Sequence, residues 1–267
     1  MSEFLLELYS EEIPPELQIS AREELKEKIK NSLNEEKLRF KSIMAFSSPT
    51  RLAILITNIN SKVQIPAKEI KGPKVGVIED VLNSFIKAHN SSKKEVFVKE
   101  IEKGKFYFLK TKSKEVLAKD LLIKIVLNSI ASLNWKKSMK WSNNDLVWGR
   151  PLRSILAIFN KKYLSFNYGH LKSKDTAIIE KDLTIKLKKV KSFKEYQSFL
   201  RSNNILLNQE ERKNKILKKF ENICKIKNYK NHFNQHLIEE VANIVEDPNV
   251  LFVDFNKNYL DIPNEII

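Results

Sequence analysis

The sequence predicts an α+β fold, with strands and helices mixed over about the first 170 residues and helices predominant in the last third. Three observations carry this prediction: a strand–helix–strand–strand opening, two β-hairpins in the middle and three helical segments near the end. A doubly wound parallel sheet would alternate strands and helices instead. We therefore expect two or more subdomains: an α+β domain over residues 1–170, and a basic, mainly helical domain over residues 171–267 that ends in a strand.

The opening elements follow from hydrophobic spacing. Residues 4–9 form an apolar-rich run that is typical of a buried strand. The pair Pro14-Pro15 comes next and suits the first turn of a helix, where no backbone N–H is missed. Apolar residues then recur every four positions over residues 17–33, which gives this helix one apolar face. The next two predicted strands span residues 43–46 and 52–59.

The later elements are predicted from the same patterns. Glu102-Lys103-Gly104 is a turn between two β-prone runs and predicts a hairpin, and Asn160-Lys161-Lys162 predicts a second one. Residues 116–133 carry leucine and isoleucine along one side and predict a helix. The remaining expected elements are a short helix at 81–89, hairpin strands at 96–101, 105–110, 153–159 and 163–168, helices at 193–201, 209–225 and 236–245, and a strand at 249–255.

Composition restricts the class of protein. The chain has 267 residues, of which 42% are hydrophobic, so it can bury a core. No apolar run approaches the ~18 residues that a membrane span needs, and the amino terminus lacks the basic region and long apolar stretch of a secretion signal. The single cysteine, Cys224, excludes an intrachain disulfide. We expect a cytoplasmic protein without a membrane partner.

Charge is the strongest compositional signal. Lysine and arginine total 48 against 33 acids, which gives a net charge of +15, and only seven of the 48 are arginine. The positive charge lies in the middle of the chain, while residues 1–40 and 231–267 are acidic. This distribution suits a polyanion, nucleic acid above all. The alternative is a solvated lysine-rich surface. In such a chain an arginine is informative, because lysine cannot replace its planar fork.

The sequence contains no catalytic motif. With five glycines it has neither G-x-G-x-x-G nor G-x-x-x-x-G-K-[ST]. His232 and His236 are four residues apart but do not form H-E-x-x-H, and Cys224 has no nearby partner for a nucleophile dyad. We therefore expect no catalytic residue, no metal site and no cofactor bound by this chain.

All three tryptophans, Trp135, Trp141 and Trp148, fall in one cationic segment that ends at Arg153. Aromatic faces can stack on exposed bases, while lysine and arginine pair with phosphates. The segment therefore predicts an RNA-binding site. The alternative is that Trp141 and Trp148 pack in the core beside a hairpin.

Two adjacent acids, Glu11 and Glu12, precede Pro14-Pro15. We interpret them mainly as acids that cap the start of the following helix, because the helix dipole favours negative charge there. A pair of acid–base carboxylates is the less favoured alternative, and contact with a basic partner is a third.

Several segments together resemble the beta subunit of bacterial glycyl-tRNA synthetase, in order and spacing from residue 5 to about residue 265. They are Leu8–Pro15, Ser48–Ala53, Lys71–Pro73, Lys137–Trp141, Arg150–Arg153, Glu210–Lys213, Glu239–Val241 and Val245–Pro248. Two departures stand out. Thr50 replaces the first arginine of the family's T-P-R-R, and residues 178–181 do not show its G-H-R-F segment.

The resemblance implies a fold region and a division of labour. The family's alpha subunit activates glycine with ATP and Mg, the beta subunit supplies tRNA(Gly) binding, and the two form an α2β2 tetramer. It also implies that the family's C-terminal anticodon-binding region is absent from these residues. Glu11 and Glu12 are then candidates for the interface with the alpha subunit. The candidate RNA contacts are Arg51, Lys71, Lys140, Trp141, Arg150 and Arg153.

Two other functions stay open at this stage. In one, the chain is a non-enzymatic interaction module that grips the alpha subunit through the acidic helix around residues 11–36. In the other, it is an unrelated lysine-rich RNA-binding protein, and the agreement in motif order is a coincidence.

Overall fold

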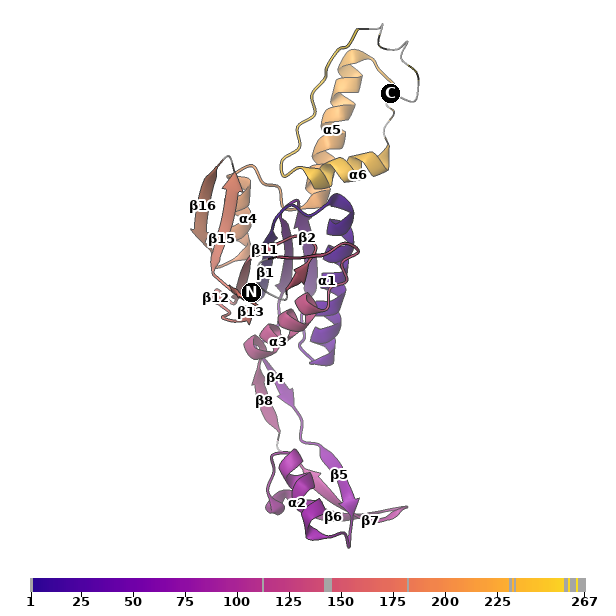
Figure 1. Ribbon diagram of the computed structural model, residues 1–267, viewed down its shortest axis with the longest axis vertical. Coiled ribbons are helices and arrows are strands. Elements are labelled where there is room, and N and C mark those ends of the chain that lie inside the picture. Colours follow the sequence, from indigo (N-terminus) through magenta and orange to yellow (C-terminus); the bar gives the residue numbers. More distant parts are fainter. Residues whose placement is uncertain are drawn as a thin grey trace.

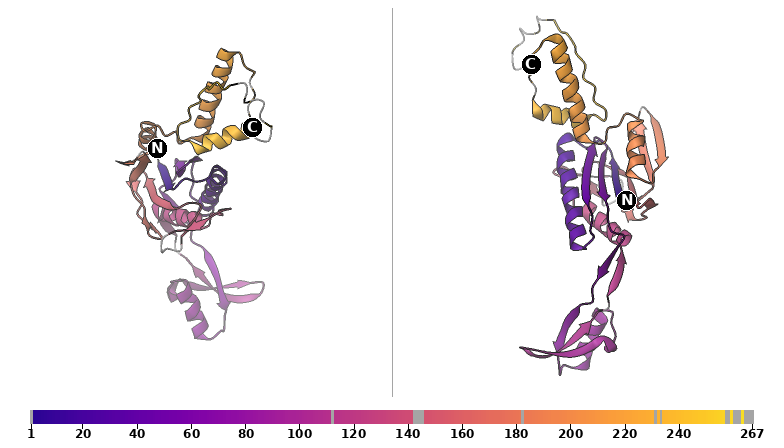
Figure 2. Two further views of the ribbon diagram at one scale, coloured as in Figure 1. Left: turned by 45° about the horizontal axis from the view of Figure 1, so that its top comes forward. Right: turned by 180° about the vertical axis from the view of Figure 1, so that it is seen from behind.

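A computed structural model of the chain shows a central body, a small lower domain on a two-stranded arm, and a pair of helices above the body (Figure 1). Two further views show the same three parts (Figure 2). Strands and helices are mixed throughout, which confirms the α+β prediction. The structure describes residues 2–111, 113–141, 146–181, 183–230, 232, 234–256, 259 and 263.

The body is built on a five-stranded antiparallel sheet in the order β12-β11-β1-β3-β2. β1 is the central strand: Leu6 lies opposite Ala157 on one side and opposite Ile54 on the other. A strand that is covered on both faces and both edges needs apolar residues almost throughout, which is why residues 4–9 are so apolar. The strands are β1 (Glu3–Ser10), β2 (Ser42–Ser48), β3 (Arg51–Thr57), β11 (Leu152–Phe159) and β12 (Lys162–Tyr163).

The two faces of this sheet bury two apolar clusters. Alternate β1 residues Phe4, Leu6 and Leu8 pack beneath α1 (Pro15–Glu35) and α3 (Ala118–Ala131). The opposite face, with Leu5, packs against α4 and β15. These elements are α4 (Phe193–Arg201) and β15 (Thr176–Lys181), and β15 pairs with the exposed strand β16 (Thr184–Lys189). The second cluster joins residues on both sides of the predicted boundary near residue 170.

The lower domain is inserted between β3 and α3. Its arm is the antiparallel pair β4 (Lys62–Ile65) and β8 (Lys114–Leu117). At the end of the arm lies a three-stranded sheet in the order β5-β7-β6, with a short 3₁₀ turn and one α-helix beside it (Figure 1). These elements are β5 (Glu69–Lys74), α2 (Glu79–Ala88), η1 (Lys93–Glu95), β6 (Val96–Ile101) and β7 (Gly104–Lys110).

The upper pair consists of α5 (Gln209–Lys227) and α6 (Gln235–Ile244). Asn208 caps α5, since its side chain accepts a hydrogen bond from the backbone N–H of Glu210. None of the described helices has the length and apolarity to cross a bilayer. The strand predicted at residues 249–255 is wrong, because this segment has no regular structure and no strand pairs with it. Alternation alone does not make a strand without a neighbouring edge.

Other differences concern hairpins. β15 and β16 form a six-pair hairpin that the lysine-rich composition of residues 181–189 obscured. The second predicted hairpin is shorter than expected, because β11 pairs with β12 over two positions only. The chain then forms a small separate pair, β13 (Asn167–Tyr168) with β14 (Leu171–Lys172).

Candidate nucleic-acid interface

The tryptophan segment is held by a short antiparallel pair, β9 (Met139–Lys140) and β10 (Val147–Trp148). Trp148 is buried, with 1% of its surface exposed, and its ring centroid lies 4.9 Å from that of Trp135. A Cβ at Gly149 would lie 2.3 Å from the Trp135 ring, so only glycine fits beside it without a shift. Trp135 and Trp148 are therefore packing residues, as the core alternative predicted for Trp148.

This packing forms a pocket of about 270 Å³ between the start of α1 and the cationic segment. Its cations are Lys136, Lys137 and Arg150, whose side chains are exposed, and its only carboxylate is that of Glu16. The full lining is Pro14, Glu16, Leu17, Lys136, Lys137, Ser138, Met139, Gly149 and Arg150. Three cations around a partly apolar hollow suit a phosphate with an adjoining sugar or base. We call these residues the cationic pocket.

Two predicted RNA contacts lie close to the cationic pocket in sequence. Lys140 is exposed on β9, next to the pocket residue Met139. Trp141 is half-buried, packs against the main apolar cluster and meets His170 edge-on at 6.3 Å between ring centroids. Part of the Trp141 ring is thus exposed to solvent, and part packs against the body. Both residues stay predictions as RNA contacts.

Arg153 is occupied by acids. Its guanidinium pairs with Glu11 at 3.2 Å and with Glu180, which also accepts a hydrogen bond from it. Its side chain is nevertheless 41% exposed, so a phosphate would compete with two carboxylates for this arginine. Arg153 is therefore a weaker candidate for an RNA contact than Arg150, and both stay predictions.

The capping interpretation of Glu11 and Glu12 is wrong. The residue before α1 is Pro14, and no side chain caps this helix. The acid in its first turn is Glu16. Glu11 pairs with Arg153 instead, and Glu12 is exposed. Neither acid therefore caps the first N–H groups of α1.

Arg51 is not available to RNA, and its prediction as a contact is corrected. The residue is 1% exposed. Its guanidinium pairs with Glu246 at 2.9 Å and Glu7 at 3.2 Å, and donates to the carbonyl of Ile178 at 2.6 Å. Burial acts to lower the pKa of Arg51, but Glu7, Tyr196, Glu246 and Tyr9 together outweigh burial and raise that pKa, so the guanidinium stays charged.

Glu7 is the buried counterpart of Arg51. It is 1% exposed and accepts a hydrogen bond from the hydroxyl of Tyr196 on α4. Burial raises the pKa of the Glu7 carboxyl, and Arg51 only partly opposes this effect. Burial and the Glu7 carboxylate together raise the pKa of Tyr196 well above its usual value. The three side chains form an ionic network inside the second apolar cluster.

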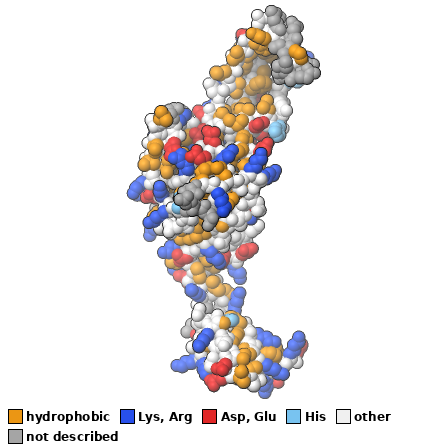
Figure 3. Space-filling view, in the orientation of Figure 1, with side chains coloured by type: hydrophobic (Ala, Val, Ile, Leu, Met, Phe, Trp, Pro, Cys, Tyr) orange, Lys and Arg blue, Asp and Glu red, His pale blue; other side chains and the backbone are white. Residues whose placement is uncertain are grey.

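Lys71 lies on β5 in the lower domain, apart from the other predicted contacts (Figure 1). Its ammonium sits 3.8 Å from the centroid of the Phe106 ring. The structure therefore does not gather the six predicted RNA residues into one site. Figure 3 shows lysine and arginine side chains over both the body and the lower domain rather than in a single continuous stripe.

The family assignment rests on the whole length of the chain. A protein-family model described as glycyl-tRNA synthetase beta subunit matches residues 4–267. The chain belongs to this family. It is 36% identical to the glycine–tRNA ligase beta subunit of Rickettsia felis, 35% to that of Rickettsia akari and 34% to that of Rickettsia prowazekii. Each match covers 100% of this chain, and the chain spans 40% of the length of these curated relatives.

The motifs that pointed to the glycyl-tRNA synthetase beta-subunit family converge in space. The backbone N–H of Ser10 donates to Thr50 at 2.9 Å, and that of Glu11 donates to Pro151 at 3.0 Å. The ion pair between Arg51 and Glu246 joins segment Ser48–Ala53 to segment Val245–Pro248. We call the place where these segments meet Arg212 the junction. It connects the central sheet to the residues that follow α6.

Arg212, from the E-E-R-K segment of the beta-subunit family, completes the junction. It is 0% exposed and has no carboxylate within ion-pair distance among the described residues. Its guanidinium donates to backbone carbonyls of Ala242 at 2.6 Å, Leu206 at 2.6 Å and Ser47 at 2.9 Å. Burial lowers its pKa to about 10, so it is charged at neutral pH.

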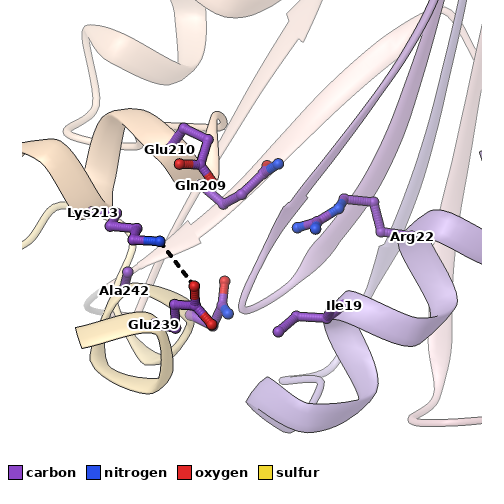
Figure 4. Close-up of a pocket in the computed structure, with 8 residues that line it drawn as sticks. Ile19, Arg22, Gln209, Glu210, Lys213, Glu239 and Ala242 are labelled. Atoms are coloured by element: carbon purple, nitrogen blue, oxygen red, sulfur yellow. Dashed lines mark hydrogen bonds and ion pairs between the residues drawn. The ribbon is translucent and has the colours of Figure 1, made fainter. Parts of the chain in front are cut away.

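Beside Arg212 a smaller pocket of about 130 Å³ lies between α1 and the pair α5–α6 (Figure 4). Lys213 and Glu239 form an ion pair of 2.8 Å on one side, and Arg22 lies on the other (Figure 4). Hydrogen bonding to Glu239 raises the pKa of Lys213. Across the described part of the chain, no three His, Cys, Asp or Glu side chains are grouped so that they could hold a metal ion.

Sequence reasoning missed two sets of functional or structural residues. Lys136 and Lys137 are within the tryptophan segment but were not among the predicted RNA contacts. Their place in the pocket depends on the β9–β10 pair, which brings them to Arg150. Glu7 carried a signal, because an acid inside a buried apolar strand needs a partner. Tyr196, 189 residues away, carried none.

Proposed function

We propose that this chain is the tRNA-binding part of a glycine–tRNA ligase beta subunit. It works with a catalytic alpha subunit, in an α2β2 assembly in the cytoplasm, in the ATP-dependent attachment of glycine to tRNA(Gly). The match to the beta-subunit family over residues 4–267 carries this proposal. The curated relatives are named as subunits of this ligase. In this proposal the alpha subunit binds ATP and Mg, and this chain has no chemical step of its own.

The cationic pocket is the proposed contact with tRNA(Gly). Lys136, Lys137 and Arg150 are exposed at its rim and would meet phosphates. Lys140 and Trp141 would extend this contact, with the free part of the indole against an unpaired base. If about six phosphates are neutralised in all, affinity should fall about 10³-fold between 50 and 200 mM salt.

The proposed contact with the alpha subunit is acidic. Glu12 is exposed and has no ion pair among those found in the described residues, so it can meet a basic surface. Glu11 is a weaker candidate, because it already pairs with Arg153. Both acids precede α1, on the segment that also approaches the cationic pocket at Pro14.

The tRNA role is tested by charge reversal at the cationic pocket. The double variant Lys137→Glu/Arg150→Glu is compared with Lys191→Glu/Lys194→Glu, a matched pair of exposed lysines elsewhere on the body. Gel shift against tRNA(Gly) should show a loss of at least about tenfold for the first pair and a much smaller loss for the second. Equal losses would indicate a diffuse field rather than a site.

Two further results would contradict the proposal as a whole. One is formation of glycyl-adenylate by the chain without an alpha subunit. The other is indifference of the chain to tRNA(Gly) even when the alpha subunit is supplied. The same mixture, assayed for aminoacylation, also reports whether reversal at the cationic pocket impairs charging.

A further inference from the structure

The three-stranded sheet of the lower domain is covered on one face only. Side chains alternate between the faces of a strand. On the covered face, Gly72 lies against Phe85 of α2, where an added Cβ would come within 2.6 Å of the ring. Ile86 of α2 and Leu109 of β7 are buried on this side. Apart from the short 3₁₀ turn η1, no other described helix lies beside this sheet (Figure 1).

The opposite face carries three phenylalanines. Phe97 on β6 lies directly across from Phe108 on β7, and their rings are stacked at 6.0 Å between centroids. Phe106 is two residues from Phe108 and so shares this face. Phe97 and Phe106 are each half-buried. We call Phe97, Phe106, Phe108 and the lysines above them the phenylalanine face.

Lysine ammonium groups lie over two of these rings. Lys71 lies 3.8 Å from the Phe106 centroid, and Lys99 lies 5.6 Å from that of Phe108. Both are exposed, flexible side chains that can move aside at little cost. Lys99 also pairs with Glu69 at 2.8 Å. The face therefore presents planar rings with cations at their edges.

A pocket continues the phenylalanine face toward the arm. Its volume is about 430 Å³, and Phe97 forms part of its wall together with the exposed cations Lys94 and Lys110. Its lining is Ala67, Lys94, Glu95, Val96, Phe97, Lys110, Thr111 and Ser113. One ring, two cations, two hydroxyls and the carboxylate of Glu95 thus surround one hollow.

Charge favours an anionic occupant. Residues 66–111 contain ten lysines, no arginine and six acids. Lysine meets phosphate as a point charge without demanding one geometry. Aromatic rings on a sheet face, with cations beside them, are suited to unpaired bases, because every base has a planar face.

We propose that the phenylalanine face binds a single-stranded stretch of RNA. One base stacks on Phe97 in the pocket, and a second stacks on Phe106 after Lys71 moves aside. The phosphates are met by Lys71, Lys94 and Lys110. This surface is distinct from the cationic pocket of the body, so it can hold or fail separately from the proposed tRNA(Gly) role.

An acidic protein segment is the competing occupant. It would bind the same lysines, but a planar ring would bind it little better than another apolar side chain of similar size. A leucine in place of Phe97 or Phe106 keeps most of the apolar contact and removes the stacking surface. This substitution therefore separates the two classes of ligand.

The test measures fluorescence anisotropy of a labelled eight-nucleotide single-stranded RNA with the whole chain. Phe97→Leu/Phe106→Leu should raise the Kd about tenfold or more, since one base–aromatic stack is worth about 5- to 150-fold in affinity. Lys71→Ala/Lys110→Ala should weaken binding and flatten its salt dependence. The control Lys87→Ala, an exposed lysine on α2, should change the Kd less than about twofold.

Thermal unfolding of each variant confirms that the chain is folded. An unchanged Kd in the double phenylalanine variant would overturn the proposal, as would an equal loss in Lys87→Ala. So would an acidic peptide that displaces the RNA and binds the phenylalanine variant as tightly as the parent. If Lys137→Glu/Arg150→Glu loses oligonucleotide binding and the lower-domain variants do not, the single strand binds the body, and the proposal is overturned.

Discussion

The junction and the lower domain use cations in opposite ways. In the junction, Arg51 and Arg212 are buried, and their guanidinium groups bind carboxylates and backbone carbonyls. In the lower domain every cation is a lysine, and Lys71 and Lys99 lie exposed over phenylalanine rings. An arginine that persists in a lysine-rich chain can thus mark a structural need for several directed hydrogen bonds. It need not mark a phosphate.

The largest effect expected from this contrast is on stability at Arg212. Arg212→Leu leaves the carbonyls of Ser47, Leu206 and Ala242 buried without a donor. The free energy of unfolding, measured with urea, should fall by about 3–5 kcal/mol. Arg212→Lys should recover only part of it, because one ammonium cannot reach all three carbonyls.

A lysine of the lower domain provides the control for Arg212. Lys103→Ala, in the exposed turn between β6 and β7, should change the free energy of unfolding by no more than about 0.5 kcal/mol. If Arg212→Leu is equally mild, buried arginines do not secure α5 and α6 to the sheet.

A smaller effect is expected from glycines that approach aromatic rings. Gly149→Ala places a Cβ against Trp135, which is itself packed on buried Trp148, and should cost about 1–3 kcal/mol. Gly72→Ala meets Phe85 in the same way, but that half-buried ring can turn outward. Urea unfolding should therefore show a smaller loss at Gly72. The reverse order would mean that the lower domain is the more rigid of the two regions.

The pH dependence of stability tests the ionic network of the junction. Because the pKa of Glu7 is raised by folding, its contribution is fully present below the ordinary glutamate value of 4.5 and is lost as pH rises through the folded pKa. Glu7→Gln removes this titration. The free energy of unfolding of the variant should thus rise relative to the parent as pH increases above 4.5. A constant difference from pH 4.5 to 8 would contradict a raised pKa.

The smallest effect on stability is expected at an exposed lysine of the lower domain. Lys71→Ala should alter stability by no more than about 0.5 kcal/mol, because its ammonium is in water and its contact with Phe106 is a surface one. Thermal unfolding checks this. A large loss would mean that Lys71 is needed to shield the phenylalanine rings in the folded state, rather than free to move for a ligand.

Local signals were enough for much of the fold. The spacing of apolar residues predicted α1, and α4 begins and ends at the predicted residues, Phe193 and Arg201. The arm was missed because β4 and β8 pair across the inserted domain, and neither strand has a local partner. Hairpin β15–β16 was missed because β16 lies in a lysine-dense stretch and is exposed throughout, although Ile185 and Leu187 alternate with polar residues.

The site was less predictable than the fold, because its chemistry depends on distant partners. Arg150 and Lys140 are near each other in sequence, and the β9–β10 pair keeps them so, but as RNA contacts both stay predictions. Arg51 was assigned wrongly because Glu246, which occupies it, is 195 residues away. The phenylalanine face became visible only when pairing had placed β6 beside β7 and α2 behind them.

The paired arm allows the lower domain to be removed or exchanged by engineering. Lys62 lies opposite Leu117 and Ile65 opposite Lys114, so the polypeptide leaves and re-enters the body one strand spacing apart. A two-residue Asn-Gly link from Ile65 to Lys114 would close these strands as an ordinary hairpin. The whole appendage could thus be excised, or exchanged for another, without rethreading a single strand of the central sheet.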